Sequence, residues 1–549
     1  MSRHRSTLTR RRFLAAASVA LGARISAQPS REVLYNGVVL AQPWPPRRRR
    51  WSTVPERPPY LASPPEVIRI DTGRQLFVDD FLIEESSLYR EFHRAEYHAR
   101  NPLLAPEQPW EIDDPYATAT KTPPNPAAML YSDGVFFDPS DRLFKMWYMA
   151  GYQQHTALAT STNGIDWRRR TSNVIPGTNI VRKHRRDSTT VWLDLNERDP
   201  SARFKMAWTP MEGNRLLRLS TSPDGIHWTD RAGAGPAGDR STCFFNPFRN
   251  RWCFSLRVDD SLLGRVRGYA ESPTFIGAKW SGNDSVAWVA ADTDDRAQPD
   301  GRNAELYNLD AVAYESVMLG MFAIFHGEES NREKSNDLTV AFSRDGFHWS
   351  RPSRDAFIGV SDRQGDWNWA NVQSAGGVCL VVGDRLHFYV SGRAGVPGTS
   401  LPGRCSTGLA TLRRDGFASV TDRWPATIAR PIGGHASALI TRPVQFSGAH
   451  CFVNADVEGA MRVEVLDRSG KAISGFTAAQ CQPVTGNQTK HAVRWGGAAL
   501  GSLANSVVRF KFVLDRARLY AFWVSPSPRG ESRGYLGAGG PGYGSTLDA

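Results

Sequence analysis

The stretch Ser343-Arg-Asp-Gly-Phe-His-Trp349 is one copy of a motif that recurs along the chain. Clear copies end in Asn/Asp-Gly-x-x-Trp at Ser161–Trp167 and Ser222–Trp228, and weaker copies lie at Glu271–Trp280 and Arg414–Phe417. Roughly 30 residues before each copy, an apolar strand runs into a polar turn. These strands are Val135–Pro139, Val191–Asp194, Cys243–Pro247, Val312–Tyr314 and Val378–Val382. A fixed period with several short strands per unit is typical of radial repetition, so the five units predict a five-bladed β-propeller over residues 66–430.

The pattern changes after Pro431. Alternating segments such as Met461–Leu466 and Val507–Val513, separated by turn residues, predict a small antiparallel β-sandwich over residues 431–524. The whole chain is therefore expected to be all-β. Residues 28–65, rich in Pro and Arg, predict an extended linker, and the Gly-rich residues 525–549 predict a disordered tail.

The N-terminus predicts export. Thr9-Arg-Arg-Arg-Phe-Leu14 precedes a short apolar stretch, and small residues ending at Ala27 offer a cleavage site. Residues 1–27 resemble a twin-arginine signal peptide, which implies the Tat translocon as a partner during export and a periplasmic or secreted location. No other segment is apolar and long enough to span a bilayer.

The charge of the chain is unevenly distributed. The formal net charge is +12, but residues 1–51 hold eleven Arg and one Glu, so the remainder is nearly neutral. A nearly neutral folded body argues against a nucleic-acid partner. The six Cys are too few for a disulfide scaffold and match no zinc spacing, although Cys243 with Cys253 and Cys451 with Cys481 could pair or remain buried thiols. No cofactor or metal is implied.

Acidic residues stand at the predicted starts of three inner strands. Asp187, Asp239 and Glu305 occupy these positions in the second, third and fourth units. A propeller gathers its strand starts around one channel, and a set of carboxylates there provides the acid and base that glycosidic cleavage requires. We expect Glu305 as general acid and Asp187 or Asp239 as base or nucleophile. Acidic residues at strand ends can also act as turn formers or ion-pair partners.

Other polar and aromatic residues at this end of the strands suit a sugar. Aromatic faces stack on sugar rings, whereas Arg and His donate to hydroxyl groups. The candidate substrate-binding residues are Tyr307, Arg257, His326, Arg393, Trp367 and Asp133.

With these residues in view, the chain resembles a known superfamily. The segments Leu76–Ile83, Phe144–Tyr148, Asp239–Thr242 and Arg413–Phe417 resemble the five-bladed glycoside hydrolases, the superfamily of invertases, levansucrases and arabinanases. The closest resemblance is to a bacterial branch with a C-terminal β-sandwich. It implies a glycosidase with carboxylates in the channel. Invertase-like Asn-Asp-Pro and Arg-Asp-Pro motifs do not begin an inner strand here, and arabinanase-like members place their carboxylates in the first three blades.

Together these observations predict an exported glycoside hydrolase that acts on a plant or algal saccharide. A non-catalytic glycan-binding propeller of the cell envelope is the alternative. A phosphorylase, with Arg257, Arg267 and Arg393 as a phosphate cradle, is a third. The sugar, the linkage, the stereochemical course and the oligomeric state are left open.

Overall fold

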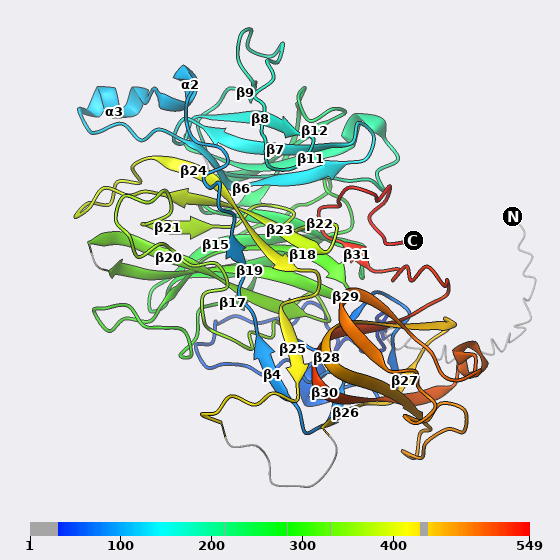
Figure 1. Ribbon diagram of the computed structural model, residues 1–549. Coiled ribbons are helices and arrows are strands. Elements are labelled where there is room, and N and C mark those ends of the chain that lie inside the picture. The colour runs from blue at the N-terminus through cyan, green and yellow to red at the C-terminus, as the bar shows by residue number, and fades with distance from the viewer. Residues whose placement is uncertain (1–30, 214, 283, 330, 429–436) are drawn as a thin grey trace, which may run out of the picture.

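The computed structural model describes residues 31–213, 215–282, 284–329, 331–428 and 437–549, so the predicted signal peptide lies outside the described residues. Strands dominate (Figure 1). The short helices are α1 (Pro59–Ala62), α2 (Pro109–Ile112), α3 (Pro115–Thr120) and the 3₁₀ turns η1 (Pro200–Ala202) and η2 (Leu500–Leu503). Within the described ranges, no helix is long and apolar enough to cross a membrane.

Three four-stranded antiparallel sheets follow one another along the chain. The first contains β6 (Ala128–Asp138), β7 (Leu143–Ala150), β8 (His155–Ser161) and β9 (Ile180–Arg182). The second contains β10 (Arg186–Leu193), β11 (Phe204–Pro210), β12 (Leu216–Ser222) and β13 (Thr229–Pro236). The third contains β14 (Thr242–Asn246), β15 (Arg251–Asp260), β16 (Gly264–Ser272) and β17 (Val286–Val289).

The fourth sheet has nine strands. It contains β18 (Glu305–Glu315), β19 (Val317–Glu329), β20 (Arg332–Ser343), β21 (Asn371–Gln373), β22 (Leu380–Val382), β23 (Arg385–Arg393), β24 (Cys405–Arg413), β5 (Glu96–Tyr97) and β31 (Tyr535–Leu536). A single parallel pair, Asn336 with Asn371, joins the β18–β20 part to the β21–β24 part. The all-β, propeller-like architecture is confirmed, but strand pairing does not divide the chain into five separate blades.

Polar contacts link the inner strands side by side. The Ser188 hydroxyl on β10 donates to the carbonyl of Ser241 just before β14 (2.9 Å), and the Thr242 hydroxyl on β14 donates to the carbonyl of Leu309 on β18 (2.7 Å). After β21, the carbonyl of Ser374 accepts from the backbone N–H of Ser132 on β6 (3.2 Å). These contacts bring strand starts that are far apart in the sequence to one central region.

The recurring motif forms the expected tight turn. Gly225 has φ +77°, and the Asp224 carboxylate accepts from the backbone N–H groups of Ile226 and His227 (2.9 Å each). The turn also accepts a bond from the neighbouring sheet, since Trp147 Nε1 donates to the carbonyl of Gly225 (2.8 Å). The motif is therefore structural: it shapes the turn and fastens one sheet to the next.

A ten-stranded sheet forms the second module, below the propeller-like sheets in Figure 1. Its strands are β1 (Ile68–Arg69), β2 (Gln75–Leu76), β3 (Ile83–Ser86), β4 (Tyr89–Phe92), β25 (Ala418–Thr421), β26 (Ala438–Thr441), β27 (Val444–Gln445), β28 (His450–Leu466), β29 (Val484–Val493) and β30 (Val507–Ser525). Both ends of the range predicted as propeller thus contribute strands here. The short strands β1–β4 pair with β27, β30, β26 and β25 respectively, in addition to the pairs that these four strands form with one another.

The segments outside the predicted domains pack against the sheets. The prediction that residues 525–549 are disordered is wrong, because β31 pairs with β18 and Leu536 is fully buried. In the predicted linker, Tyr35 stacks on Phe248 at 4.1 Å, and Trp51 Nε1 donates to the carbonyl of Arg267 (2.7 Å). All six cysteines are buried free thiols. Composition suggested an extended linker and a disordered tail, but aromatic and apolar residues of both segments pack against the sheets.

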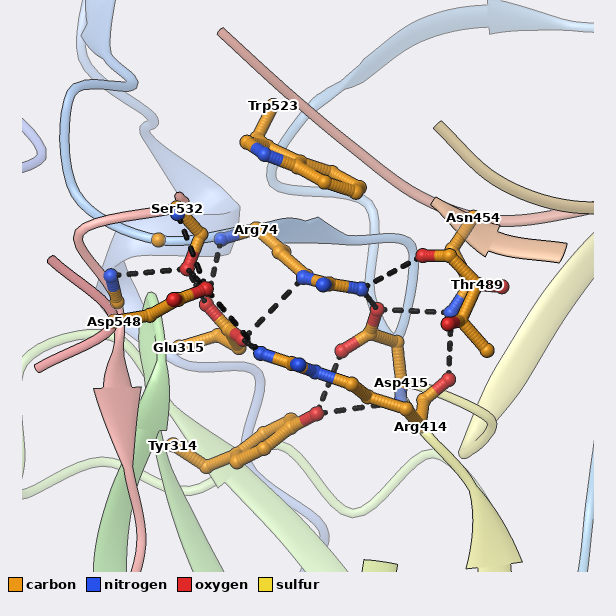
Figure 2. A network of polar contacts seen from close by, with 12 residues as sticks. Arg74, Tyr314, Glu315, Arg414, Asp415, Asn454, Thr489, Trp523, Ser532 and Asp548 are labelled. Atoms are coloured by element: carbon orange, nitrogen blue, oxygen red, sulfur yellow. Dashed lines mark hydrogen bonds and ion pairs between the residues drawn. The ribbon is translucent and has the colours of Figure 1, made fainter. Parts of the chain in front are cut away.

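A buried ion network joins the two modules, as Figure 2 shows. Glu315, at the end of β18, pairs with Arg414 (3.0 Å) and with Arg74 (3.5 Å). Arg74 also pairs with Asp415 (2.9 Å), and Asp415 accepts from the Asn454 side chain of β28 (2.9 Å). The C-terminal segment contributes Ser532 and Asp548. The Ser532 hydroxyl donates to Glu315 and to Asp548, and Asp548 also pairs with Arg414. Four stretches of chain therefore depend on one buried carboxylate.

We expect Glu315→Gln to lower the free energy of unfolding by about 3 kcal/mol, because two buried guanidinium groups lose their shared counter-charge. Urea unfolding followed by tryptophan fluorescence measures the change. Glu458→Gln, which breaks the exposed pair with Arg423, is the control and should leave the unfolding midpoint unchanged. A Glu315→Gln variant as stable as the wild type would show that the network does not hold the modules together.

Candidate functional site

An irregularity at the start of β6 shapes the centre of the channel. The ladder between β6 and β7 is broken between Met129 and Gly134, and Tyr131 and Ser132 have φ values of +45° and +73°. Non-glycine residues rarely adopt such values, because each costs of the order of 1–3 kcal/mol and persists only where its surroundings impose it. The chain from Tyr131 to Asp133 therefore leaves the ladder and is fully or almost fully buried among the inner strands.

Arg240 holds this irregular segment. Its guanidinium donates to the carbonyl of Tyr131 (2.9 Å) and to the hydroxyl of Ser132 (3.0 Å), and it lies 3.9 Å from the centre of the Tyr131 ring. The backbone N–H of Arg240 donates to Asp187 Oδ1 (2.9 Å). One residue therefore ties the strained segment of β6 to the candidate carboxylate on β10.

Asp187 lies near the start of β10 and is 4% exposed. Its Oδ1 accepts from the backbone N–H groups of Ser188 (2.8 Å) and Arg240, while Oδ2 has no hydrogen-bond partner among the described residues. Burial raises the pKa of Asp187, and the negative charge of Asp239 raises it further; Arg240 opposes both effects. A carboxyl in this setting retains its proton to a higher pH than an ordinary aspartate.

Asp239 has a different environment. It precedes β14, its side chain is 37% exposed, and it forms an ion pair with Arg257 of β15. Arg257 also pairs with Asp259 (2.6 Å). The cation keeps Asp239 next to an opposite charge in a partly solvated position, so the two aspartates are neighbours with contrasting surroundings.

Glu305 begins β18 and is mostly buried. It accepts from Arg265 twice, from the guanidinium (2.7 Å) and from the backbone N–H (3.0 Å). The carboxylate of Glu305 is thus held by a single arginine, and the general-acid role expected for it from the sequence stays a prediction.

The structure brings some of the other predicted residues to the centre. Tyr307 on β18 lies 5.9 Å from the guanidinium of Arg240, and Arg393 on β23 lies 5.3 Å from the Tyr131 ring. Asp133 is fully buried and pairs with Arg186 (2.6 Å); burial raises its pKa to about 7 although Arg186 opposes the rise. Asp133 is therefore enclosed in an ion pair with Arg186 and has no exposed surface.

Two further predicted residues have close partners in the nine-stranded sheet. His326 on β19 is 4% exposed and faces Asp337 (3.2 Å). It follows Phe325, which pairs with Glu305, so it lies level with the start of β18. Trp367 packs edge-on against Tyr97 of β5, at a ring distance of 5.8 Å, and covers glycines of β23 and β24.

Sequence reasoning missed the arginines beside the carboxylates. Arg186 and Arg240 are immediate chain neighbours of Asp187 and Asp239, and both are buried. The adjacent pairs Arg186-Asp187 and Asp239-Arg240 at two strand starts could have pointed to these arginines. Nothing in the sequence pointed to Tyr131, because only the irregularity in β6 turns its side chain toward Arg240.

The arrangement also bears on the phosphate cradle. Arg267 is fully buried and donates to the carbonyls of Arg240 and Ser255 (2.7 Å each), and Arg257 is held by its two aspartates. Of the three arginines considered, Arg257 alone forms an ion pair among the described residues, and Arg393 alone has neither an ion pair nor a side-chain hydrogen bond there. Across the described part of the chain, no group of three or more His, Cys, Asp or Glu residues is placed to hold a metal ion.

Comparisons with known proteins return glycoside hydrolase structures. A putative glycoside hydrolase from Bacteroides ovatus ATCC 8483 is 13% identical, with 58% of this chain and 97% of that chain covered and a TM-score of 0.39. A thermostable family-43 glycoside hydrolase is 11% identical, with 55% and 97% covered and a TM-score of 0.39. A β-fructofuranosidase from Schwanniomyces occidentalis is 12% identical, with 79% and 97% covered and a TM-score of 0.35. No family model and no curated protein matches.

We expect Asp187 to titrate above the ordinary aspartate pKa of about 4, because it is buried beside a second carboxylate. Carboxyl ¹³C chemical shifts followed against pH, assigned with Asp187→Asn, measure the titration. Asp239→Asn should lower the pKa of Asp187, since one neighbouring negative charge is removed. Glu305→Gln is the control and should leave it unchanged. A pKa at or below 4 in the wild type would contradict the burial of this carboxyl.

Proposed function

We propose that the protein is a glycoside hydrolase in which Asp187 is the general acid and Asp239 is the base or nucleophile. The observation that carries the proposal is the contrast between these neighbours: Asp187 is buried with a raised pKa, and Asp239 is partly exposed and paired with Arg257. Glycosidic cleavage needs such a pair, one carboxyl protonated and the other ionised.

The two steps follow from these positions. Asp187 would donate its proton to the glycosidic oxygen as the bond to the anomeric carbon breaks. Asp239 would then either activate a water molecule or attack the anomeric carbon itself. Tyr307 and Arg240 lie between the strand starts and would contact the sugar. The ion pair with Glu305 would hold the guanidinium of Arg265 beside the Tyr307 ring, 5.3 Å from its centre.

The ion pairs also favour a second candidate. Asp239 and Glu305 are each engaged by an arginine, as in a site that binds a glycan without cleaving it. A non-catalytic glycan-binding protein of the cell envelope would use the same tyrosines and arginines. It would bind glycans with no turnover, and its binding would survive the loss of both aspartates.

The test compares Asp187→Asn and Asp239→Asn on a panel of plant and algal oligosaccharides and on aryl glycosides. We expect each variant to lose kcat by about 10²–10⁴-fold. A dinitrophenyl leaving group needs no proton, so it should restore turnover in Asp187→Asn but not in Asp239→Asn. Asp194→Asn, just beyond the opposite end of β10, is the control and should retain activity.

The pH profile follows from the raised pKa of Asp187. A general acid must be protonated, so wild-type kcat should fall as the pH rises through that pKa, and Asp187→Asn with the activated substrate should lack this fall. Turnover that survives in both variants would overturn the assignment. Binding without turnover by the wild type on every substrate would favour the second candidate.

We also propose export through the Tat translocon to the periplasm or the medium, as the sequence of residues 1–27 suggests. Fractionation of bacterial cells that express the full chain tests this. Changing Arg10 and Arg11 together to Lys should leave the unprocessed protein in the cytoplasm, whereas the wild type should appear outside it with a lower mass. Equal export of both proteins would refute the twin-arginine route.

A further inference from the structure

Arg393 differs from the other arginines of the channel. It ends β23, is 2% exposed, and has no ion pair and no side-chain hydrogen bond among the described residues. Its neighbours are aromatic faces, since its guanidinium lies 5.3 Å from the Tyr131 ring and 5.5 Å from the Tyr152 ring. A buried cation is costly without a counter-charge, so this one calls for an anion that the chain does not supply.

Arg393 lies in register with two buried amides, of which, among the described residues, Asn371 is hydrogen-bonded and Asn336 is not. Asn371 of β21 pairs with Arg393 on one side and with Asn336 of β20 on the other, so the three lie side by side across three strands. Asn336 is fully buried, yet neither its amide nitrogen nor its amide oxygen has a partner within the described ranges. Buried amides are normally satisfied, and those that are not often mark a bound ligand or water.

The pocket beside this row is cationic. Arg393, Arg332 and Lys334 line it together with Trp369 and Asn371, and no Asp or Glu is among its described lining residues. The nearest acidic partner of Arg332 is Asp362, at 3.9 Å and fully exposed to solvent. Such a pocket attracts an oxyanion, and Trp369 offers an aromatic face next to it.

Tyr131 connects Arg393 with the candidate catalytic pair. Tyr131 lies close to both cations, with the guanidinium of Arg240 at 3.9 Å and that of Arg393 at 5.3 Å from its ring. Arg240 in turn donates its backbone N–H to Asp187. A ligand with its anionic group at Arg393 would therefore reach across Tyr131 toward Asp187.

We propose that the substrate is an acidic saccharide, and that Arg393 receives the carboxylate of a uronic acid residue. This inference rests on the proposed action on a glycan and names its class. Two of the unpartnered nitrogens of Arg393, Nε and Nη2, form one edge of the guanidinium. That edge carries two parallel N–H groups and matches a planar carboxylate with two hydrogen bonds. Phosphate or a sulfated sugar offers the same charge without the planar shape.

The experiment measures binding by calorimetry with the full chain. The probes are oligogalacturonides and glucuronate-containing oligosaccharides, each beside its carboxyl-reduced counterpart, together with a sulfated oligosaccharide and inorganic phosphate. We expect the acidic member of at least one pair to bind tenfold or more tightly than the reduced member. Arg393→Met should abolish this preference, and Arg393→Lys should retain part of it, because lysine keeps the charge but not the paired N–H groups.

Arg385→Met, at the exposed opposite end of β23, is the matched control and should keep the preference. Circular dichroism and the unfolding midpoint establish that each variant is folded. If Arg393→Met does not fold, Lys334→Gln replaces it as the test, and it should weaken the preference for the acidic member of the pair. Equal binding of acidic and reduced partners overturns the proposal. So does tighter binding of the sulfated oligosaccharide or of phosphate through Arg393.

Failure of the proposed function gives a different result. A chain that prefers acidic glycans through Arg393 but hydrolyses none would retain the acidic-saccharide site and lose the catalytic assignment. A chain that hydrolyses neutral glycans with the expected dependence on Asp187 would retain the catalytic assignment and lose the acidic-saccharide site.

Discussion

The buried carboxylate of Glu315 is the interaction on which the arrangement of the molecule depends. It lies at the tip of a tight hairpin between β18 and β19, with φ +49°, where it meets two arginines from distant parts of the chain (Figure 2). Without that charge, the two guanidinium groups would have to become solvated or leave the interface. Either change costs free energy, because both groups are buried. β18 begins at the opposite end with Glu305 and Tyr307. The strand that anchors the sandwich is therefore also a strand that lines the candidate site.

The same principle governs the channel. A narrow space filled with acidic and basic groups is stable only where each buried charge has a partner, so partners come from neighbouring strands: Arg186 with Asp133, and Arg265 with Glu305. Asp187 has no such partner, and neither does the buried Asp310 of β18, which accepts from hydroxyl and amide groups instead. The charge of Asp187 is stabilised only by two backbone N–H groups and the nearby cation Arg240, and burial beside Asp239 raises its pKa. The chemistry assigned to Asp187 follows from that incomplete compensation.

The sequence was sufficient for features that depend on local chemistry. The Asp-Gly turns, the strand order and the location of Asp187, Asp239 and Glu305 at strand starts all follow from periodicity and turn residues. Features that depend on which residues contact each other across the fold could not be predicted from the sequence. The ion pair of Glu305 with Arg265 is formed between strands of different sheets, and Trp367 packs against Tyr97 of β5. The tail looked disordered because Gly and Ser dominate it, whereas a few apolar residues such as Leu536 decide its place.

The arginines of the channel show how structure adds to sequence. From residue type alone, Arg257, Arg267 and Arg393 are equivalent donors for an anion. In the fold, Arg257 is neutralised by aspartates and Arg267 donates to backbone carbonyls, so neither has an unmet requirement. Arg393 is as deeply placed as Arg267 but is surrounded by tyrosine faces, which favour a cation without replacing a counter-ion. Of the three, Arg393 alone has neither a counter-charge nor a hydrogen-bond acceptor among the described residues, and this selects it as the place where a ligand can contribute most.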